Sequence, residues 1–398
     1  MTLTDKKIAL VITGGIAAYK AAELARLIIK EGGQVRTAMT KSATEFITPL
    51  TMRTLTNAPV AVDMWQAETT EVDHISLADW ADAVVIAPAT ANIIGKLANG
   101  IADDFVSTFL LAVKAPVLVC PSMNVNMYDH PAVKDNLSKL ASRGLRIAEP
   151  GSGYLACGWE GKGRLLEPSE ILEEIKALFV PQDLKGVNAL VTAGPTREPW
   201  DDIRFISNRS TGQMGLALAK TARRRGARVT LVCGPVTFTP PYGIQTVKVE
   251  TTVDMLEAVR ERLADIDVLV KAAAPGDFRP AGRVKGKVKK TSDPPPLELD
   301  RNPDILSTLS PNKGRTIFVG FAAESENLLE NARDKLQRKQ LDLIVANQIG
   351  PPDESFGAAT NRVWIIDRQG EVQEIPLSAK EAVADRIWDR VSELRTSA

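Results

Sequence analysis

The chain has 398 residues, which exceeds the length of about 100 to 200 residues of a typical domain, so two domains are expected. Lysine plus arginine and aspartate plus glutamate number 49 each, and this balance argues against a nucleic-acid binder and favours small-molecule or protein partners. Three cysteines and two histidines are too few for a disulfide framework or for a metal site made of these residues. The sequence has neither a signal peptide nor a run of about 18 apolar residues, so we expect a cytoplasmic protein without membrane contact.

The N-terminal half alternates short apolar runs with helical patterns. A charged lead-in, an apolar run and a Thr-Gly loop at residues 7–15 predict the first βα unit of a nucleotide-binding sheet. Strands are expected at Lys7–Thr13, Gln34–Met39, Ala83–Pro88 and Pro116–Cys120, and helices at Ile16–Lys30, Thr48–Leu55, Asn92–Asn99, Asp104–Val113 and Pro131–Ser142. This alternation predicts a doubly wound α/β sheet.

Small polar and glycine-rich loops follow these strands, where a doubly wound sheet binds its ligands. They are Gly14–Ala17, Thr40–Ser42, Pro88–Asn92 and Pro121–Asn124. The first loop is neither G-x-G-x-x-G nor a P-loop, so neither NAD nor a nucleotide γ-phosphate is specified, although N–H groups at helix starts suit a phosphate. Each loop alone could be a tight turn without a ligand, but four at one sheet edge favour a ligand.

Three side chains in this half are candidates for chemistry. His74 suits proton transfer near neutral pH, although a lone histidine is as often a surface or core residue. Asn124 could orient a carboxylate, although an Asx turn is its more common role. Cys157 lies in the glycine-rich stretch 151–164, which we expect to be a mobile loop that closes over a ligand. Such a loop is a poor place to bury a small hydrophobe, so a reactive thiol is favoured.

Together, TGGIAAYKA, His74, APATANIIGKLANGIADD, PSMNVNM and the Cys157 loop resemble the flavin-dependent cysteine decarboxylases, specifically the phosphopantothenoylcysteine decarboxylases. The resemblance implies a flavodoxin-like domain over residues 1–180 that binds FMN. It implies that the flavin oxidises the cysteinyl end of the substrate to a thioaldehyde, that CO₂ then leaves, and that the reduced flavin returns the electrons. The implied FMN residues are Gly14, Gly15, Ile16, Thr40, Ala89 and Thr90, and the resemblance implies that some of them act across a subunit interface.

The same resemblance assigns roles to the three candidates. His74 would be the base or orienter, Asn124 would hold the substrate carboxylate, and Cys157 would donate a proton as the enethiolate is reduced. Ser122 stands where the family more often has alanine, a small departure beside Asn124.

The pattern of strand, loop and helix begins again at Leu184. An amphipathic helix within Leu165–Pro181, with Ser169 as its N-cap, ends the first half. Strands are expected at Val187–Ala193, Arg228–Val232, Ile244–Val249, Val268–Ala272, Thr316–Phe321, Leu343–Ala346 and, at an edge, Val363–Ile366, and helices at Met214–Arg224 and Ala379–Leu394. The chain is therefore predicted to be an α/β protein with two doubly wound, mostly parallel Rossmann-like sheets in tandem, over residues 1–180 and 181–398.

Two stretches of the second half suit anions. Ser210–Gly212 opens a helix as an anion cradle or as a plain cap, and Asn208 could pair with an amide or carboxyl group nearby. In RVKGKVKK, residues 283–290, cationic side chains occupy every second position, so an extended strand would point them to one face. A solvated face or a lysine-guarded edge is the alternative. The Pro-rich flanks favour a loop that folds over a triphosphate, which would bring Mg²⁺.

FISNRSTGQMG, GDFRP, KVKK, NPDI, GFAAE and DLIVAN resemble the phosphopantothenate–cysteine ligases, in the form fused behind the decarboxylase, which uses CTP. The resemblance implies that the pantothenate carboxylate attacks the α-phosphate to give an acyl-cytidylate and pyrophosphate, and that the cysteine amine then displaces CMP. Asn208 would bind and activate the acyl group, Lys287 would reach over the phosphates, and Asp277 would also meet Mg²⁺. The implied nucleotide residues are Asp277, Pro303, Asp304, Ile305, Phe321, Lys335 and Lys339. Two departures from the family pattern are present. Gln213 stands where the ligases commonly have lysine, and AAAPGDF differs from their usual AAVxDY or AAVxDF.

Both resemblances together imply a bifunctional enzyme of coenzyme A biosynthesis. The second half would join 4′-phosphopantothenate and L-cysteine, and the first half would decarboxylate the phosphopantothenoylcysteine to 4′-phosphopantetheine. We expect a homo-oligomer that combines trimeric N-terminal with dimeric C-terminal contacts. A flavin-binding regulatory protein without turnover is disfavoured because His74, Asn124 and Cys157 are all present. A flavin prenyltransferase or a nicotinamide oxidoreductase is disfavoured by the missing G-x-G-x-x-G and by the lysine-rich stretch.

Overall fold

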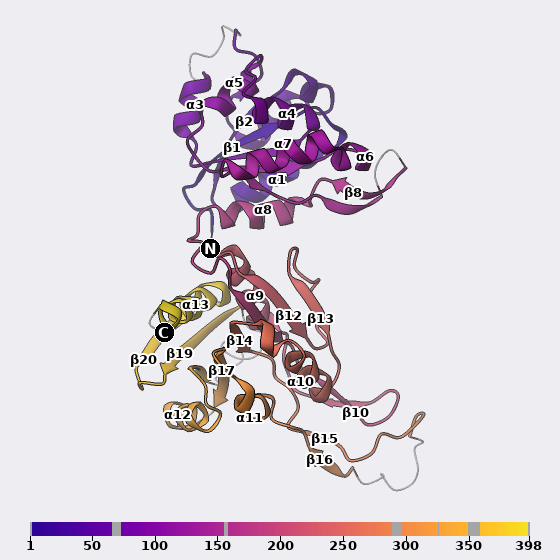
Figure 1. Cartoon of the computed structure of the whole chain (residues 1–398), viewed down its shortest axis with the longest axis vertical. Helices are drawn as coiled ribbons and strands as arrows, with labels where there is room; N and C mark the ends of the chain where they lie inside the picture. Colours follow the sequence, from indigo (N-terminus) through magenta and orange to yellow (C-terminus); the bar gives the residue numbers. More distant parts are fainter. Residues whose placement is uncertain are drawn as a thin grey trace. The chain divides into compact units, whose positions relative to one another are not determined.

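The computed structural model describes residues 2–65, 73–154, 158–288, 297–324, 326–348 and 359–396 (Figure 1). Cys157 and Lys289 lie outside the described residues. The chain divides into two compact units, Met1–Val180 and Pro181–Ala398. Among the described residues, no helix is long and apolar enough to cross a membrane.

The first unit is built around a parallel sheet with the strand order β3-β2-β1-β4-β5-β6. Its strands are β1 (Lys7–Ile12), β2 (Gln34–Met39), β3 (Val60–Ala61), β4 (Ala83–Ala89), β5 (Val117–Pro121) and β6 (Arg146–Ile147). Without the two-residue β3, this is the order 2-1-3-4-5 of flavodoxin-like sheets. Every residue of β4 is buried, as the predicted apolar runs require of a strand covered on both faces.

Helices cover both faces of this sheet (Figure 1). Ala9 and Val11 of β1 belong to a core that includes Ile93 and Phe109 from the helices of one face. On the other face α1 and α8 pack against each other. The helices are α1 (Lys20–Lys30), α2 (Pro49–Thr56), α3 (His74–Trp80), α4 (Ala91–Asn99), α5 (Phe105–Ala112), α6 (Val125–Asp129), α7 (Pro131–Ser142) and α8 (Pro168–Ala177), with short 3₁₀ turns at Ile16–Tyr19 and Lys41–Glu45.

The start of α8 differs from the prediction. Its N-cap is Glu167, and Pro168 occupies the first turn, where a proline costs no hydrogen bond. Glu167 and Glu170 form a reciprocal capping box. Ser169 is therefore inside the helix, and its prediction as N-cap is wrong.

The glycine-rich stretch forms an antiparallel hairpin on both sides of its undescribed tip. The hairpin pairs β7 (Gly151–Tyr154) with β8 (Glu160–Arg164), where an irregular loop was predicted. The Met123 N–H donates a hydrogen bond to the Gly163 carbonyl at 3.0 Å. A Cβ on Gly163, which has φ +145°, would lie 2.3 Å from the Met123 carbonyl oxygen. The glycine at 163 therefore lets β8 approach the segment that ends in Asn124.

The second unit contains a larger sheet with the order β13-β12-β9-β14-β17-β18-β19-β20. Its strands are β9 (Asn188–Ala193), β12 (Arg228–Cys233), β13 (Gln245–Lys248), β14 (Val268–Lys271), β17 (Ile317–Glu324), β18 (Leu343–Gln348), β19 (Thr360–Asp367) and β20 (Val372–Ala379). The six strands from β13 to β18 are parallel and follow the Rossmann order 3-2-1-4-5-6. The antiparallel β19 and β20 extend the sheet beyond β18.

The predicted edge position of Val363–Ile366 is wrong. These residues lie inside β19, which is paired on both sides, and the edge strand is β20. Most side chains of β20 are exposed, so it lacks the apolar signal that identified the other strands.

Two layers of helices enclose this sheet as well (Figure 1). Trp388 of α13 is fully buried and donates from Nε1 to the Leu218 carbonyl of α9 at 2.9 Å. On the other face, Leu256 and Leu306 join Phe318 of β17 in a second core. The helices are α9 (Gln213–Arg224), α10 (Thr252–Arg260), α11 (Ile305–Leu309), α12 (Leu328–Arg338) and α13 (Lys380–Thr396), with 3₁₀ turns at Leu263–Asp265 and Ser310–Asn312.

Two small hairpins stand outside the large sheet. One pairs β10 (Arg197–Pro199) with β11 (Phe205–Ser207), and the other pairs β15 (Phe278–Pro280) with β16 (Leu299–Arg301). The described residues 283–288 form bends and no strand, as expected of the loop that the Pro-rich flanks favoured over an edge strand. Asp201 and Asp202 hold this segment, because their carboxylates accept from the N–H groups of Val288 at 3.2 Å and Gly286 at 2.8 Å.

Candidate functional sites

The first unit has a pocket of about 710 Å³ at the carboxyl ends of its parallel strands, a size that suits a cofactor. Five of the six predicted flavin residues line it: Gly14, Gly15, Ile16, Thr40 and Thr90. Ala89, the sixth, is buried in β4, and its carbonyl accepts from the Ser122 N–H at 3.0 Å. The loops after β1, β2, β4 and β5 therefore meet at one edge, as the sequence predicted.

Close packing and one buried hydroxyl hold these loops together. A Cβ on Gly14 would lie 2.4 Å from Cβ of Ser42, so the loops after β1 and β2 meet only because residue 14 is glycine. Thr13 Oγ1 donates to the Pro88 carbonyl at 2.8 Å and accepts from the Thr90 N–H at 3.1 Å. The role of Thr13 was not predicted, because a threonine that ends an apolar strand carries no distinctive signal.

A charged group at the rim of this pocket was also missed. Lys96 of α4 donates to Asp103 at 2.6 Å and to Asp104 at 2.8 Å, and all three side chains line the pocket. These two hydrogen bonds raise the pKa of Lys96. The charges therefore compensate one another within the pocket wall.

The predicted catalytic residues His74 and Asn124 are not gathered in this pocket. Neither His74 nor Asn124 belongs to the described residues that line it, and Cys157 lies outside the described residues. His74 is the first residue of α3, behind the N-cap Asp73. Asn124 caps α6, and its Oδ1 accepts from the Asn126 N–H at 2.8 Å, which is the geometry of an Asx turn.

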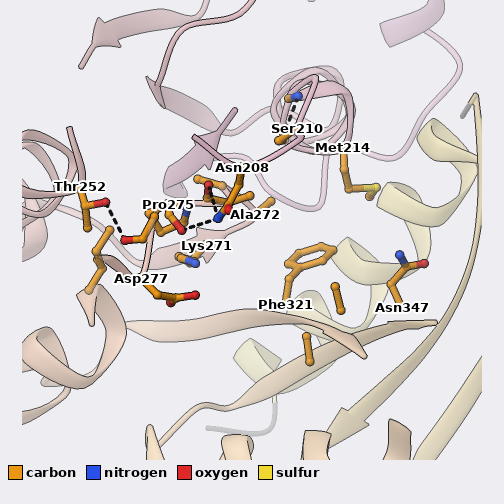
Figure 2. Close-up of a pocket in the computed structure, with 18 of the residues that line it drawn as sticks. Asn208, Ser210, Met214, Thr252, Lys271, Ala272, Pro275, Asp277, Phe321 and Asn347 are labelled. Carbon is orange, nitrogen blue, oxygen red and sulfur yellow. Dashed lines mark hydrogen bonds between the residues drawn. The ribbon is translucent and has the colours of Figure 1, made fainter. Parts of the chain in front are cut away.

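The second unit has a pocket of about 580 Å³ beside β14 and β17 (Figure 2). All seven predicted nucleotide residues and Asn208 line it, although they come from segments up to 131 residues apart in the sequence. Further lining residues are Arg209–Gly215, Thr252, Lys271–Gly276, Asn302, Ala322, Ala323, Asn347, Asn361 and Lys380. Lys287 is exposed and is not one of the described lining residues.

Asn208 is oriented by the loop that follows β14. Its Nδ2 donates to the Pro275 carbonyl at 2.9 Å and lies 3.4 Å from the Ala274 carbonyl (Figure 2). Gly212, with φ +72°, turns the chain from this residue into α9. The amide is thus fixed shortly before α9, whose first residues also line the pocket.

A buried polar group supports the same loop from behind. Thr196 Oγ1 accepts from the Gly276 N–H at 2.9 Å and donates to Glu198 at 2.8 Å. Thr252 Oγ1 lies 2.8 Å from Glu198 and 3.2 Å from the Gly276 carbonyl. Glu198 and both threonines are almost fully buried. The sequence did not predict this role, which depends on contacts between residues up to 80 positions apart.

Charged side chains fill the far side of the pocket. Lys339 forms an ion pair with Asp304, which also caps α11 through the Ser307 N–H at 3.0 Å. Burial acts to raise the pKa of Asp304, but the hydrogen bonds from Lys339 and Ser307 outweigh it and hold that pKa low. Burial and the neighbouring Lys339 lower the pKa of Lys335.

Lys271, the last residue of β14, was not predicted to be a site residue. Burial, followed by the charges of Lys335 and Lys339, lowers its pKa to about 7. A lysine that ends the apolar run VLVK was the available signal, since the ends of parallel strands form the ligand edge.

Comparisons with known proteins match both units. Residues 1–180 match the family model described as Flavoprotein, and residues 184–394 match the one described as DNA/pantothenate metabolism flavoprotein C-terminal domain. The coenzyme A biosynthesis bifunctional protein CoaBC of Bacillus subtilis (strain 168) is 45% identical over 397 residues, with 98% of each chain covered. The protein of the same name from Escherichia coli (strain K12) is 43% identical over 397 residues, again with 98% of each covered.

Among solved structures, the crystal structure of the C-terminal domain of a coenzyme A biosynthesis bifunctional protein CoaBC is similar to this chain. It is 39% identical, covers 55% of this chain and 100% of its own, and gives a TM-score of 0.48. The full-length identities are well above the level at which family membership is in question. The chain therefore belongs to the family of bifunctional coenzyme A biosynthesis proteins, in which a flavoprotein decarboxylase domain precedes a ligase domain.

Proposed function

We propose that the C-terminal unit joins L-cysteine to 4′-phosphopantothenate at the expense of CTP, and that the N-terminal unit decarboxylates the product to 4′-phosphopantetheine with FMN, in the cytoplasm. One observation carries the ligase half of this proposal. Seven residues proposed for the nucleotide and one proposed for the acyl group line a single pocket. Only the fold brings them together, so their meeting is independent support for the assignment.

In the ligase reaction, a carboxylate oxygen of 4′-phosphopantothenate attacks the α-phosphorus of CTP, and pyrophosphate leaves. The cysteine amine then attacks the acyl carbon, CMP leaves, and the amine loses a proton. Asn208 would bind the acyl group, because its amide is held at the pocket edge by the Pro275 carbonyl. Lys287 would reach over the phosphates from the segment that Asp202 holds through Gly286.

The residues present fit Mg²⁺ only as a partner of the nucleotide. The described residues contain no group of three or more His, Cys, Asp or Glu side chains that could hold a metal. Asp277, which lines the pocket, would supply one carboxylate ligand, and phosphate oxygens and water would supply the others. Bound in this way, Mg²⁺ would neutralise charge on the phosphates.

In the N-terminal unit, the pocket edge fits FMN. The backbone N–H groups of Gly15 and Ile16 open a 3₁₀ turn, and Thr40 opens another, so both loops present donors suited to a phosphate. FMN, when bound, would take electrons from the cysteinyl end of the substrate and return them after CO₂ has left. Asn124 would hold the substrate carboxylate, His74 would act as base or orienter, and Cys157 would supply a proton.

A pocket shared between subunits would reconcile these roles with the positions of His74 and Asn124 outside the pocket of one chain. Large apolar side chains are exposed next to the FMN loops, among them Ile16 at 61%, Tyr19 at 60% and Leu50 at 61%. Exposed apolar surface of this kind is typical of a protein interface. We therefore propose self-association of the N-terminal unit as a trimer, combined with dimeric C-terminal contacts.

The test follows both half-reactions in one sample of purified protein. The visible spectrum reports flavin, while CO₂ and pyrophosphate are measured after addition of 4′-phosphopantothenate, cysteine, CTP and Mg²⁺. Flavin bands together with both products support the proposal. Flavin bands with neither product would instead indicate a flavin-binding regulatory protein, and a colourless protein that releases pyrophosphate would leave the ligase half alone.

A further inference from the structure

Lys271 occupies a position in the C-terminal pocket that the reaction described above does not use. It ends β14, which lies between β9 and β17 in the parallel sheet, with Lys271 paired to Thr192 and Gly320. The rigid centre of the sheet therefore fixes its backbone. Figure 2 shows the side chain reaching into the pocket, in the part that Asn208, Asp277 and Phe321 also enter.

The ammonium group of Lys271 is not neutralised by the protein. Within the described part of the chain, no carboxylate or carbonyl accepts a hydrogen bond or forms an ion pair with it. Asp304, which is close enough to influence Lys271, is already paired with Lys339. The charged groups that act on Lys271 are Lys335 of α12, Lys339 directly after that helix, Asp304 before α11 and Asp277 after β14. Arg209 and Lys380 line the same pocket.

Without a ligand, the unpaired ammonium group of Lys271 lowers the stability of the folded protein. A cation that is removed from water and faces two further ammonium groups is stabilised only when an anion enters. The lowered pKa of Lys271, about 7, expresses this cost. Burial of an uncompensated lysine in an open pocket is typical of a site that binds a negatively charged group.

The neighbours of Lys271 indicate which anion it meets. Asn208 marks the proposed position of the acyl carboxylate, and this carboxylate must reach the α-phosphorus within bonding distance. Lys335 of α12 and Lys339, the C-cap of that helix, belong to a different part of the pocket wall. The loop that follows β14 connects the other two residues. Lys271 directly precedes this loop in the chain, and Asn208 donates a hydrogen bond to the Pro275 carbonyl within it.

We propose that Lys271 is a phosphate-binding residue of the ligase site, which contacts the α-phosphate of the nucleotide beside the acyl group and adds a third lysine to Lys335 and Lys339. This inference rests on the proposed ligase function. As the carboxylate attacks, negative charge accumulates on the α-phosphate oxygens, and an ammonium group placed beside them stabilises that charge. Lys271 would therefore contribute to turnover as well as to nucleotide binding.

The test compares the full-length wild type with Lys271→Met, Lys271→Arg and the control Lys185→Met, which removes an exposed lysine of the same unit. Binding of CTP with Mg²⁺ is measured by calorimetry, and kcat and KM are measured by pyrophosphate release. A hydrogen bond to a charged group is worth about 1.5–3 kcal/mol, which corresponds to about a 10- to 100-fold loss of kcat/KM for CTP in Lys271→Met. Lys271→Arg should recover part of the loss, and Lys185→Met should match the wild type.

Two readouts separate a lost contact from a damaged fold. Lys271→Met should raise the thermal midpoint without nucleotide, because it removes a buried charge, and CTP should raise that midpoint less than in the wild type. The decarboxylation of supplied phosphopantothenoylcysteine should not change. The inference would be overturned if Lys271→Met kept its CTP affinity and its kcat/KM within about twofold of the wild type. A difference of that size is expected of a neutral substitution.

Failure of the proposed function gives a different result. If the wild type releases no pyrophosphate, the ligase assignment fails, and calorimetry with inorganic pyrophosphate then tests the anion site by itself. Weaker pyrophosphate binding by Lys271→Met than by Lys185→Met would still support an anion-binding Lys271. Equal binding by both variants would overturn it.

Discussion

The Glu198 carboxylate accepts hydrogen bonds from both the backbone N–H of Thr252, at 3.0 Å, and its Oγ1, at 2.8 Å. This contact joins the β10 segment to the first turn of α10, behind the loop that orients Asn208. Because Thr196 bonds to the same carboxylate and to the Gly276 N–H, the site loop is held by a network of buried polar groups.

Glu198→Ala should destabilise the C-terminal unit and impair ligation. It leaves the buried Thr252 N–H and two hydroxyls without their acceptor, at a cost of about 1–3 kcal/mol for each group left unsatisfied. We expect a lower denaturation midpoint and a reduced kcat for pyrophosphate release. Decarboxylation serves as the internal control, and unchanged stability would show that the network contributes little.

Asn208→Ala tests the acyl-binding role without a large change in stability. Asn208 is exposed, and its loss should cost at most about 0.5 kcal/mol of stability, as for surface substitutions in general. We expect kcat for pyrophosphate release to fall by about 100-fold, the scale of losing one oriented donor to a reacting group. A variant that retains the wild-type kcat but binds CTP more weakly would move Asn208 to the nucleotide instead.

Lys287→Gln should suppress ligation with CTP while decarboxylation of supplied phosphopantothenoylcysteine continues. Lys287 is exposed on the segment 281–288, so its removal leaves the pocket walls intact. Pyrophosphate release and CO₂ release, measured on the same preparation, check the separation. Loss of both activities together would argue against independent sites.

The alternation of strands and helices was predictable because each buried parallel strand is a continuous apolar run bounded by turn residues. Even the carboxyl-end loops followed from this pattern, since all strands of such a sheet point the same way. The exposed strand β20 and the hairpin around Gly163 were not predictable, because their positions depend on pairing with distant strands.

The candidate sites were predictable to a different extent. Motif resemblance identified eight of the residues that line the C-terminal pocket, but it did not identify Lys271, Thr13 or Glu198. Thr13 and Glu198 act through contacts across 75 and 54 positions, and Lys271 is distinguished by its burial. No local sequence pattern reports such contacts. The sequence favoured a loop from Arg283 onward over an edge strand, but it did not reveal that the carboxylates of Asp201 and Asp202 hold this segment in bends.

Cys157→Ser tests the proton-donor role in the N-terminal unit. The variant should keep its flavin spectrum and should still release CO₂, because decarboxylation precedes the proposed protonation. A serine hydroxyl is a much weaker acid than a thiol, so an oxidised or enethiol product should accumulate, which mass spectrometry of the reaction mixture detects. A normal yield of 4′-phosphopantetheine would rule out this role.

The stability of the unliganded protein should depend on pH through Lys271. Its pKa is about 7 in the folded chain and about 10.4 in an unfolded one, so between these values the unfolded state binds more protons. The free energy of unfolding therefore rises with pH across that window, by at most about 1.4 kcal/mol per pH unit. Below pH 7, where Lys271 is charged in the folded protein as well, its destabilising effect is complete.

Other buried lysines act in the same direction, so the difference between the wild type and Lys271→Met isolates the effect of this one group. Denaturation midpoints of both proteins without nucleotide, measured at pH 7 and at pH 9.5, give that difference. The stabilisation by Lys271→Met should be larger at pH 7, where the wild type carries the buried charge. An equal gain at both pH values would mean that Lys271 does not titrate in this window and that its ammonium group is well solvated in the folded protein.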